Sequence, residues 1–275
     1  MRQFIAETEP DSSGCIVVEG KKCRYLSSVL RVEPGDMLYV RLPSGALQQM
    51  TVAMLAPGGH RIVLSVAGAV QEPDVVSCGA APVASGPGCA LWLFQFAAKP
   101  PKMDLIIRQA AECGVRAVVP VAGAFCQSGN VESARKKSSP GDERWGRIIT
   151  EAREQSGSPV ETEVLPCMTL DAACALWQER AASAPALVLY EQTKGTMPLH
   201  AAVAERFSAG SAEAAALMVG AEGGISPEEL DCARAYGFVP VHFETNILRC
   251  ETAALYGIAA LQTALVEKNI WQYKK

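Results

Sequence analysis

Two short segments near the C-terminus contain the residue types that could do chemistry. In the first, an apolar run predicts a buried strand, and Gly220, Gly223 and Gly224 follow it. Glycines after a strand permit a tight turn and let the backbone approach a bound molecule closely. Ser226 then begins a helix as its N-cap, with Glu229 placed to close a capping box. The pattern predicts a loop that binds a polar or anionic ligand, and a turn that merely connects a strand to a helix is the alternative.

The second segment, 246–253, follows a predicted strand over 238–243 and leads into a long apolar helix over 253–266. It contains Arg249 and Glu251, and these side chains could stabilise an anionic group and accept a proton. The carboxyl ends of parallel strands meet at one edge of a sheet, which is where open α/β sheets bind ligands. The two segments are therefore expected to lie side by side. A surface ion pair between Arg249 and Glu251 is the alternative.

The elements that must position these segments are predicted along the rest of the chain. Residues 1–72 contain short strand-like runs separated by Pro and Gly turns, which indicates a compact β-barrel domain. Residues 73–88 are rich in proline and glycine and predict a linker. The remaining residues, 89–275, begin with a strand, a helix over 102–113 and a strand over 115–121. This order forms a βαβ unit and predicts a parallel sheet in an α/β domain.

Composition and charge narrow the class of protein. The chain has 275 residues, 49% of them hydrophobic and 20% charged, which is typical of a globular protein. No apolar run reaches the roughly 18 residues that a membrane span needs, and no signal segment is seen, so we expect a cytoplasmic protein without a membrane partner. Ten cysteines without a Cys-x-x-Cys pair favour reduced thiols over a disulfide framework or a zinc site.

The charge distribution bears on a nucleic-acid partner. The net charge of −4 argues mildly against one. Residues 99–153, however, hold ten Lys or Arg against six Asp or Glu. This segment is the better candidate for contacting a phosphate backbone, and a solvated surface with an incidental positive excess is the alternative.

The paired motifs resemble the signature of the ribosomal RNA small subunit methyltransferase E family, a SPOUT-class family. They are Gly-Ala-Glu-Gly-Gly-x-Ser-x-x-Glu, starting at Gly220, and Ile-Leu-Arg-x-Glu-Thr-Ala, starting at Ile247. The resemblance extends over nearly the whole chain through the stretches 25–36, 102–120 and 143–157.

The chain departs from the family pattern at several positions. Ala221 replaces a proline in the glycine loop, Tyr25 replaces a histidine, and Phe125 and Ser158 replace arginines. These losses keep two other readings open. One is a SPOUT methyltransferase with a different RNA target, and the other is a non-catalytic RNA-binding ribosome-assembly factor. A nucleotide-dependent dehydrogenase is disfavoured because no Gly-x-Gly-x-x-Gly follows an early strand.

The resemblance implies a fold, a reaction and partners. The implied fold class is α/β, with an N-terminal PUA-like β-barrel that binds RNA and a C-terminal SPOUT α/β domain with a deep trefoil knot. The implied reaction transfers a methyl group from S-adenosyl-L-methionine to N3 of a specific uridine in 16S rRNA. The implied partners are 16S rRNA, within an assembled small ribosomal subunit, and a second copy of the chain in a homodimer.

The resemblance also implies roles for individual residues. Arg249 and Glu251 would be catalytic, the first orienting the uracil and the second accepting the proton or capping the following helix. The loop 191–198 is placed near the cofactor. The residues that would hold the cofactor are Leu189, Gly220, Glu222, Gly223, Gly224, Ile247, Leu248 and Thr252. The residues that would contact RNA are Arg31, Lys102 and Arg108. For Arg31, a salt bridge with Glu33 or Asp36 is the alternative.

Overall fold

The computed structural model describes residues 3–56, 60–66, 89–206 and 213–267. The chain divides into two compact units. The first consists of Met1–Ala84 together with Arg153–Pro159, and the second of Ser85–Ala152 together with Val160–Lys275. The predicted linker, 73–88, lies outside the described residues.

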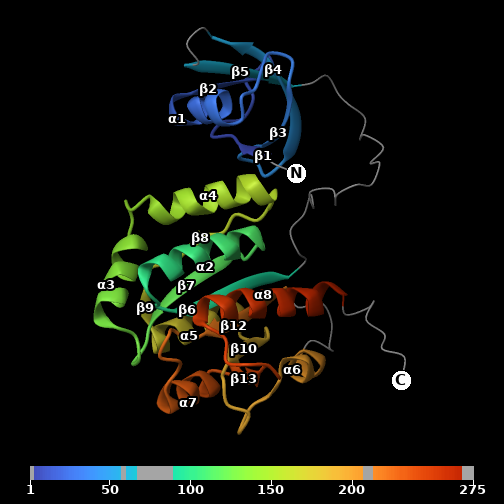
Figure 1. Ribbon diagram of the computed structural model, residues 1–275. Coiled ribbons are helices and arrows are strands. Elements are labelled where there is room, and N and C mark those ends of the chain that lie inside the picture. Colours follow the sequence, from blue (N-terminus) through green and yellow to red (C-terminus); the bar gives the residue numbers. More distant parts are fainter. Residues whose placement is uncertain (1–2, 57–59, 67–88, 207–212, 268–275) are drawn as a thin grey trace. The chain divides into compact units, whose positions relative to one another are not determined.

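The N-terminal unit is built on a five-stranded sheet with the order β1-β3-β4-β5-β2 (Figure 1). The strands are β1 (Gln3–Ile5), β2 (Cys15–Glu19), β3 (Met37–Arg41), β4 (Leu47–Leu55) and β5 (Arg61–Val66). Helix α1 (Gly20–Arg24) continues into a π-helical turn, η1 (Tyr25–Val29). Strands β1 and β2 form the two edges of the sheet and are not paired with each other within the described residues. A closed barrel therefore stays a prediction.

The second unit contains the parallel sheet that the βαβ pattern predicted. Its strand order is β11-β13-β10-β12-β6-β7-β8, with β9 paired to β7, and all of these pairs are parallel. The strands are β6 (Ala90–Phe96), β7 (Ala117–Ala122), β8 (Glu163–Val164), β9 (Met168–Thr169), β10 (Ala186–Leu189), β11 (Met197–Pro198), β12 (Ala214–Val219) and β13 (Val239–His242).

Helices cover both faces of this sheet (Figure 1). They are α2 (Pro100–Glu112), α3 (Ser128–Lys137), α4 (Arg144–Ser156), α5 (Leu170–Ala181), α6 (Leu199–Arg206), α7 (Pro227–Ala235) and α8 (Cys250–Glu267). Side chains of α2, α4, α6 and α8 share one hydrophobic cluster, and side chains of α5 and α7 share another. Helices α2 and α8 pack against each other.

Strand β6 shows why the central strands are almost entirely apolar. Leu91 and Leu93 belong to the cluster under α2 and α8, whereas Trp92, Phe94 and Phe96 belong to the cluster under α5 and α7. Successive side chains of a strand point to opposite faces, so a strand with helices on both sides buries every residue. Gln95, near the end of β6, is the buried polar exception in this strand.

The final helix begins earlier than the sequence predicted. It starts at Cys250 rather than at residue 253, so Glu251 and Thr252 lie in its first turn and not in the preceding loop. A carboxylate in the first turn is favourable because unpaired N–H groups and the positive end of the helix dipole lie there. The loop after β13 therefore ends at Arg249.

Candidate active site

A cavity of about 280 Å³ lies at the carboxyl edge of the parallel sheet. Its walls come from the loops that follow three strands, β10, β12 and β13, together with the start of α8. Strands β13, β10 and β12 are neighbours in the sheet, so their carboxyl ends bring these loops together. The two segments singled out in the sequence therefore do lie side by side, as predicted.

The glycine loop after β12 has the geometry that its sequence predicts. Gly224 has a φ of +77°, which side chains rarely adopt. A Cβ on Gly220 would lie 3.0 Å from the carbonyl carbon of Gly224, so the turn has no room for a side chain there. The capping box is confirmed. The Ser226 hydroxyl accepts from the N–H of Glu229, and the Glu229 carboxylate accepts from the N–H of Ser226.

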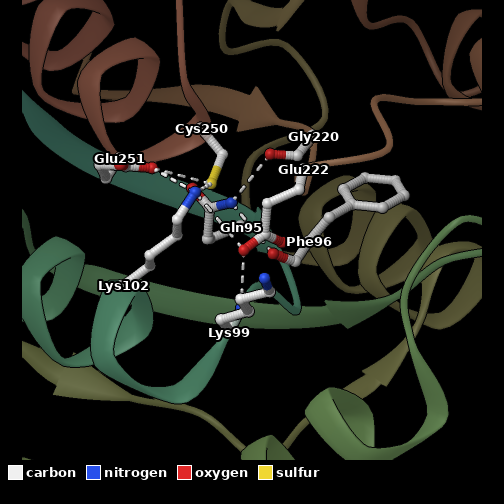
Figure 2. Close-up of polar contacts among 8 residues, drawn as sticks. All are labelled: Gln95, Phe96, Lys99, Lys102, Gly220, Glu222, Cys250 and Glu251. Atoms are coloured by element: carbon white, nitrogen blue, oxygen red, sulfur yellow. Dashed lines mark hydrogen bonds and ion pairs between the residues drawn. The ribbon is translucent and has the colours of Figure 1, made fainter.

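A buried glutamine fixes the start of this loop. The Nε2 of Gln95 donates to the carbonyl oxygens of Phe96 (3.0 Å), Val219 (3.3 Å) and Gly220 (3.1 Å), as Figure 2 shows for Phe96 and Gly220. Gln95 is fully buried in strand β6, and its Oε1 has no partner within the described residues. The sequence signal for this structural role is a single amide in an otherwise apolar strand, and Gln95 was not among the predicted site residues.

Lys102 joins the glycine loop to helix α8. Its Nζ lies 2.9 Å from Oε2 of Glu251 and 3.5 Å from Oε1 of Glu222, and it donates to the Cys250 sulfur at 3.8 Å (Figure 2). The backbone N–H of Lys99 donates to the same Glu222 oxygen at 3.1 Å. One ammonium group at the start of α2 thus holds carboxylates from two segments that are distant in the sequence.

These contacts shift the pKa values of the cluster. The hydrogen bond to Glu251 raises the pKa of Lys102, although partial burial opposes the shift. Burial raises the pKa of Glu251, but its hydrogen bonds to Lys102, to its own backbone N–H and to Cys250 outweigh burial and lower it below its usual value. Burial raises the pKa of Cys250 to about 12. The cluster at neutral pH therefore consists of a charged Lys102–Glu251 pair beside a protonated thiol.

Most of the residues predicted to hold a cofactor line the cavity. They are Leu189, Gly220, Glu222, Gly223, Gly224, Ile247 and Leu248. Thr252 is exposed and is not among the lining residues. Ile247 is 82% exposed at the mouth, although it lines the cavity.

The two residues predicted to be catalytic differ in their surroundings. Arg249 is exposed, and its side chain makes no hydrogen bond or ion pair with any residue that the structure describes. It follows the cavity-lining Leu248 directly. The Glu251 carboxylate, in contrast, is paired with Lys102 and does not line the cavity. The alternative ion pair between Arg249 and Glu251 is therefore not formed.

The cavity also has lining residues that the sequence did not single out individually. His242 ends strand β13, and its Nδ1 lies 2.8 Å from the Thr196 hydroxyl. Phe243 packs edge-on against Tyr256 of α8, with ring centroids 4.7 Å apart. Further polar or aromatic lining residues are Tyr190, Glu191, Thr245 and Asn246. They follow strands β10 and β13 closely, so a search for polar and aromatic residues at the ends of predicted strands would have found them.

The three residues predicted to contact RNA lie in different settings. Arg108 is exposed on α2. The Lys102 side chain is only 25% exposed and is occupied by the two carboxylates. Arg31, in the N-terminal unit, is exposed and has a φ of +53°. The alternative salt bridge with Glu33 or Asp36 is not formed, and Asp36 instead accepts the backbone N–H of Glu33 at 2.8 Å.

The described part of the chain contains no group of His, Cys, Asp and Glu side chains that could hold a metal ion. None of its helices is long and apolar enough to cross a membrane. Its cysteines form no disulfide bond with one another.

A parallel α/β sheet with a glycine-loop cavity at its carboxyl edge defines the class as an α/β ligand-binding protein, and the arrangement is typical of enzymes. Residues 86–262 match the family model described as an RNA methyltransferase domain. This match covers more than half of the sequence, and the chain belongs to that family. The resemblance that the two motifs carry is confirmed.

Individual relatives agree with the family match. A ribosomal RNA small subunit methyltransferase E from Mycobacterium bovis is 29% identical over 265 residues, covering 94% of this chain and 90% of that protein. One from Synechocystis sp. is 28% identical and covers 96% of this chain and 78% of that protein. The solved structure of one from Neisseria gonorrhoeae, bound to S-adenosyl methionine, has a TM-score of 0.74 at 24% identity. It covers 96% of this chain and 97% of that chain, so the two share a fold.

Proposed function

We propose that this protein is an S-adenosyl-L-methionine-dependent rRNA methyltransferase that methylates N3 of one uridine in 16S rRNA. The observation that carries the proposal is the cavity formed by the two motif loops, in which the lining residue Leu248 is followed directly by Arg249, an exposed side chain without a partner among the described residues. The family match supports the methyltransferase class, and the curated relatives support ribosomal RNA of the small subunit as the substrate.

The residues of the cavity fit the proposed cofactor. Leu189, Ile247 and Leu248 supply apolar surface of the kind that a purine ring needs, and the glycine loop supplies backbone polar groups without side chains in the way. The volume of about 280 Å³ is near the lower end for small-molecule sites. S-adenosyl-L-methionine, when bound, supplies an activated methyl group. The similar protein from Neisseria gonorrhoeae is described with this cofactor bound.

The side chains of the chain itself have two tasks in this mechanism. The first is to place the uridine and the cofactor in line, which supplies much of the acceleration of a group transfer. The second is to stabilise the uracil anion that forms when solvent water accepts the N3 proton, and Arg249 suits this task because its guanidinium stays charged and stabilises developing negative charge. Two roles are expected for Glu251, accepting the proton and capping the following helix, and the geometry supports the structural role at the start of α8. Its carboxylate holds Lys102 and lies in the first turn of α8.

We also propose the finer features of the fold and assembly. The five-stranded N-terminal sheet is assigned as the PUA-like RNA-binding domain, and the region of the two loops and α8 as the trefoil knot. The chain is proposed to act as a homodimer on an assembled small subunit in the cytoplasm. Exposed Tyr256 on the apolar helix α8 supports a contact between two copies. Light scattering of the purified protein measures the assembly state.

The decisive experiment is mass analysis of 16S rRNA nucleosides from cells that lack this gene, with and without the gene restored. Loss and recovery of 3-methyluridine at one position is the expected result. An unchanged 16S profile would contradict the proposed substrate. Analysis of the other RNAs would then test a different RNA target, which the replacement of a family arginine by Phe125 keeps open.

A further inference from the structure

Two exposed side chains flank the glycine loop at the carboxyl edge of the sheet. Strands β12, β6 and β7 are neighbours, so the loops that follow them lie next to one another. Within the glycine loop, Glu222 accepts the backbone N–H of Lys99 at 3.1 Å. The next residue, Gly223, lies against Phe125, because a Cβ on Gly223 would be 2.8 Å from the Phe125 Cβ and 3.0 Å from its carbonyl oxygen. Consecutive residues of the loop thus touch Lys99 on one side and Phe125 on the other.

Phe125 is a large apolar side chain that the fold leaves in solvent. It is 52% exposed, and its ring makes no contact with another aromatic ring within the described residues. Tyr256, the other exposed aromatic residue described, packs against Phe243. A single exposed apolar residue is common on protein surfaces and by itself indicates nothing. The position of Phe125 is informative because the residue packs against Gly223, and Gly223 lines the cavity.

The backbone that carries Phe125 is held in place on both sides. The N–H of Ala124 donates to Oε1 of Glu229 at 2.7 Å, and the N–H of Cys126 donates to the carbonyl of Gly123 at 3.1 Å. A Cβ on Gly123 would lie 2.3 Å from the ring of Phe96, so this turn is closely packed. The capping carboxylate of α7 therefore also fixes the loop of Phe125. Because the backbone is held, only the two side-chain torsions of Phe125 remain to be ordered when a partner binds, which keeps the cost in conformational entropy low.

Lys99 supplies a positive charge on the other side of the glycine loop. It is exposed, and its ammonium group has no ion-pair partner within the described residues. Only its backbone N–H holds Glu222, so the side chain is free to contact a ligand. A positive charge combined with an exposed aromatic ring is the typical means of binding single-stranded nucleic acid. The charge contacts the phosphate backbone, and the ring stacks on a base.

We propose that Phe125 and Lys99 form a nucleotide-binding rim beside the cavity, with the Phe125 ring stacked on an RNA base and the Lys99 ammonium on a neighbouring phosphate. This inference rests on the proposed function and names the side chains that hold the unpaired RNA at the site. A base to be methylated must leave its stack, and a ring at the rim stabilises it in that state.

Binding of a fluorescein-labelled decauridylate to the full-length protein tests the rim, measured by fluorescence anisotropy. Phe125→Leu keeps an apolar side chain but loses the aromatic face, and we expect it to weaken binding about tenfold. Phe125→Trp keeps the face and is expected to bind at least as tightly as the wild type. Lys99→Gln is expected to weaken binding and to lessen its salt dependence. Arg180→Gln is the matched control, since Arg180 is an exposed cation in the last turn of α5, away from this edge of the sheet.

Calorimetry with S-adenosyl-L-methionine shows whether each variant keeps an intact cavity. The rim is overturned if the wild type does not bind decauridylate, or if Phe125→Leu binds it as tightly as the wild type does. An equal loss in Phe125→Leu and Phe125→Trp also overturns it, because stacking would then not be the cause. If the expected binding pattern is found in a protein that methylates no RNA, the rim is supported and the proposed reaction is refuted.

Discussion

Lys102 holds together two carboxylates that come from different parts of the chain. Glu222 belongs to the glycine loop and Glu251 to the first turn of α8, and no other cation contacts this pair of carboxylates within the described residues. The Lys102 and Glu251 side chains are 25% and 17% exposed, so solvent screens them only in part. Removing the cation would leave two negative charges facing each other in a partly buried site. The position of the glycine loop relative to the first turn of α8 therefore depends on Lys102.

Lys102→Met is expected to weaken binding of S-adenosyl-L-methionine by about tenfold, because the glycine loop loses its tie to α8. Calorimetric titration of the purified variant measures the change. Lys102→Arg is the matched control, since it keeps a cation within reach of both carboxylates and should bind nearly as well as the wild type. Equal affinity of the Met variant and the wild type would show that the loop is held by other contacts.

The pH dependence of cofactor binding should reflect the titration of Lys102 and Glu251. The pKa of Glu251 lies below its usual value of 4.5, so the stabilising contribution of its charge is present above that pH and is lost as the pH falls through the lowered value. The pKa of Lys102 is raised above 10.5, so its contribution is present below that pH and is lost as the pH rises through the raised value. Titrations from acid to alkaline pH should therefore give constant affinity in the middle range and losses at both ends. Lys102→Met should lack the alkaline loss, and an unaltered alkaline limb in that variant would assign it to another group.

Arg249→Ala is expected to reduce methyl transfer at least 100-fold while leaving cofactor affinity within about twofold of the wild type. The reason is that Arg249 follows the cavity-lining Leu248, and its exposed side chain makes no contact within the described residues that would hold the cavity walls. Incorporation of a labelled methyl group into small subunits from cells lacking the gene gives the first quantity, and calorimetry gives the second. Unchanged turnover would remove Arg249 from the mechanism.

At the scale of elements, Asp104 joins three helices of the second unit. It lies on α2, and its carboxylate accepts from Lys137 on α3 and from Arg144 and Trp145 on α4. Burial raises its pKa, but the hydrogen bonds from Arg144, Trp145 and Lys137 together outweigh burial, and the pKa is lowered. The side chain is 12% exposed, so these bonds form in a partly dehydrated environment. The three helices therefore depend on one charged group for their mutual order.

Asp104→Asn is expected to lower the free energy of unfolding by about 2 to 3 kcal/mol at neutral pH, because it removes the charge and leaves two cations and an indole N–H with a weaker acceptor. Chemical denaturation of both proteins measures the difference. The difference should shrink as the pH falls below the usual value of 3.8, since the wild-type carboxylate then becomes protonated. Asp231→Asn, at an exposed surface pair with Arg234, is the control and should change stability little. A pH-independent difference would contradict the electrostatic explanation.

The elements and the two loops that line the cavity could be predicted from the sequence because their signals are local. A few neighbouring residues are enough to recognise the apolar strands, the glycines of the loop and the Ser226 capping box. The contacts of Gln95 with Gly220 and of Lys102 with Glu251 could not be predicted in this way, because each pair is separated by more than a hundred residues along the chain. The predicted start of α8, at residue 253, is wrong, because Glu251 lies in the first helical turn and not in the preceding loop.

At the scale of the whole molecule, an acidic protein is proposed to bind a polyanion. The net charge is −4, yet residues 99–153 carry ten basic against six acidic side chains. Part of this positive charge is used internally, because Lys102, Lys137 and Arg144 are held by carboxylates. Arg108 and, in the N-terminal unit, Arg31 are exposed and have no partner within the described residues. Local charge that is left unpaired, rather than net charge, decides the affinity for a phosphate backbone.

Binding of RNA should therefore weaken steeply with salt, whereas binding of S-adenosyl-L-methionine should change little. A titration of small-subunit RNA at several potassium chloride concentrations gives the slope of log affinity against log salt, which reports the number of phosphate contacts. Arg31→Gln and Arg108→Gln are each expected to reduce this slope by roughly 0.7 to 0.9, the effect of one lost contact. Arg180→Gln should leave it unchanged, because the side chain lies in the last turn of α5. If both test variants keep the wild-type slope, these two arginines do not contact RNA. The counterions released on binding must then come from other side chains, and the shallower slope of Lys99→Gln would point to the rim beside the cavity as one source.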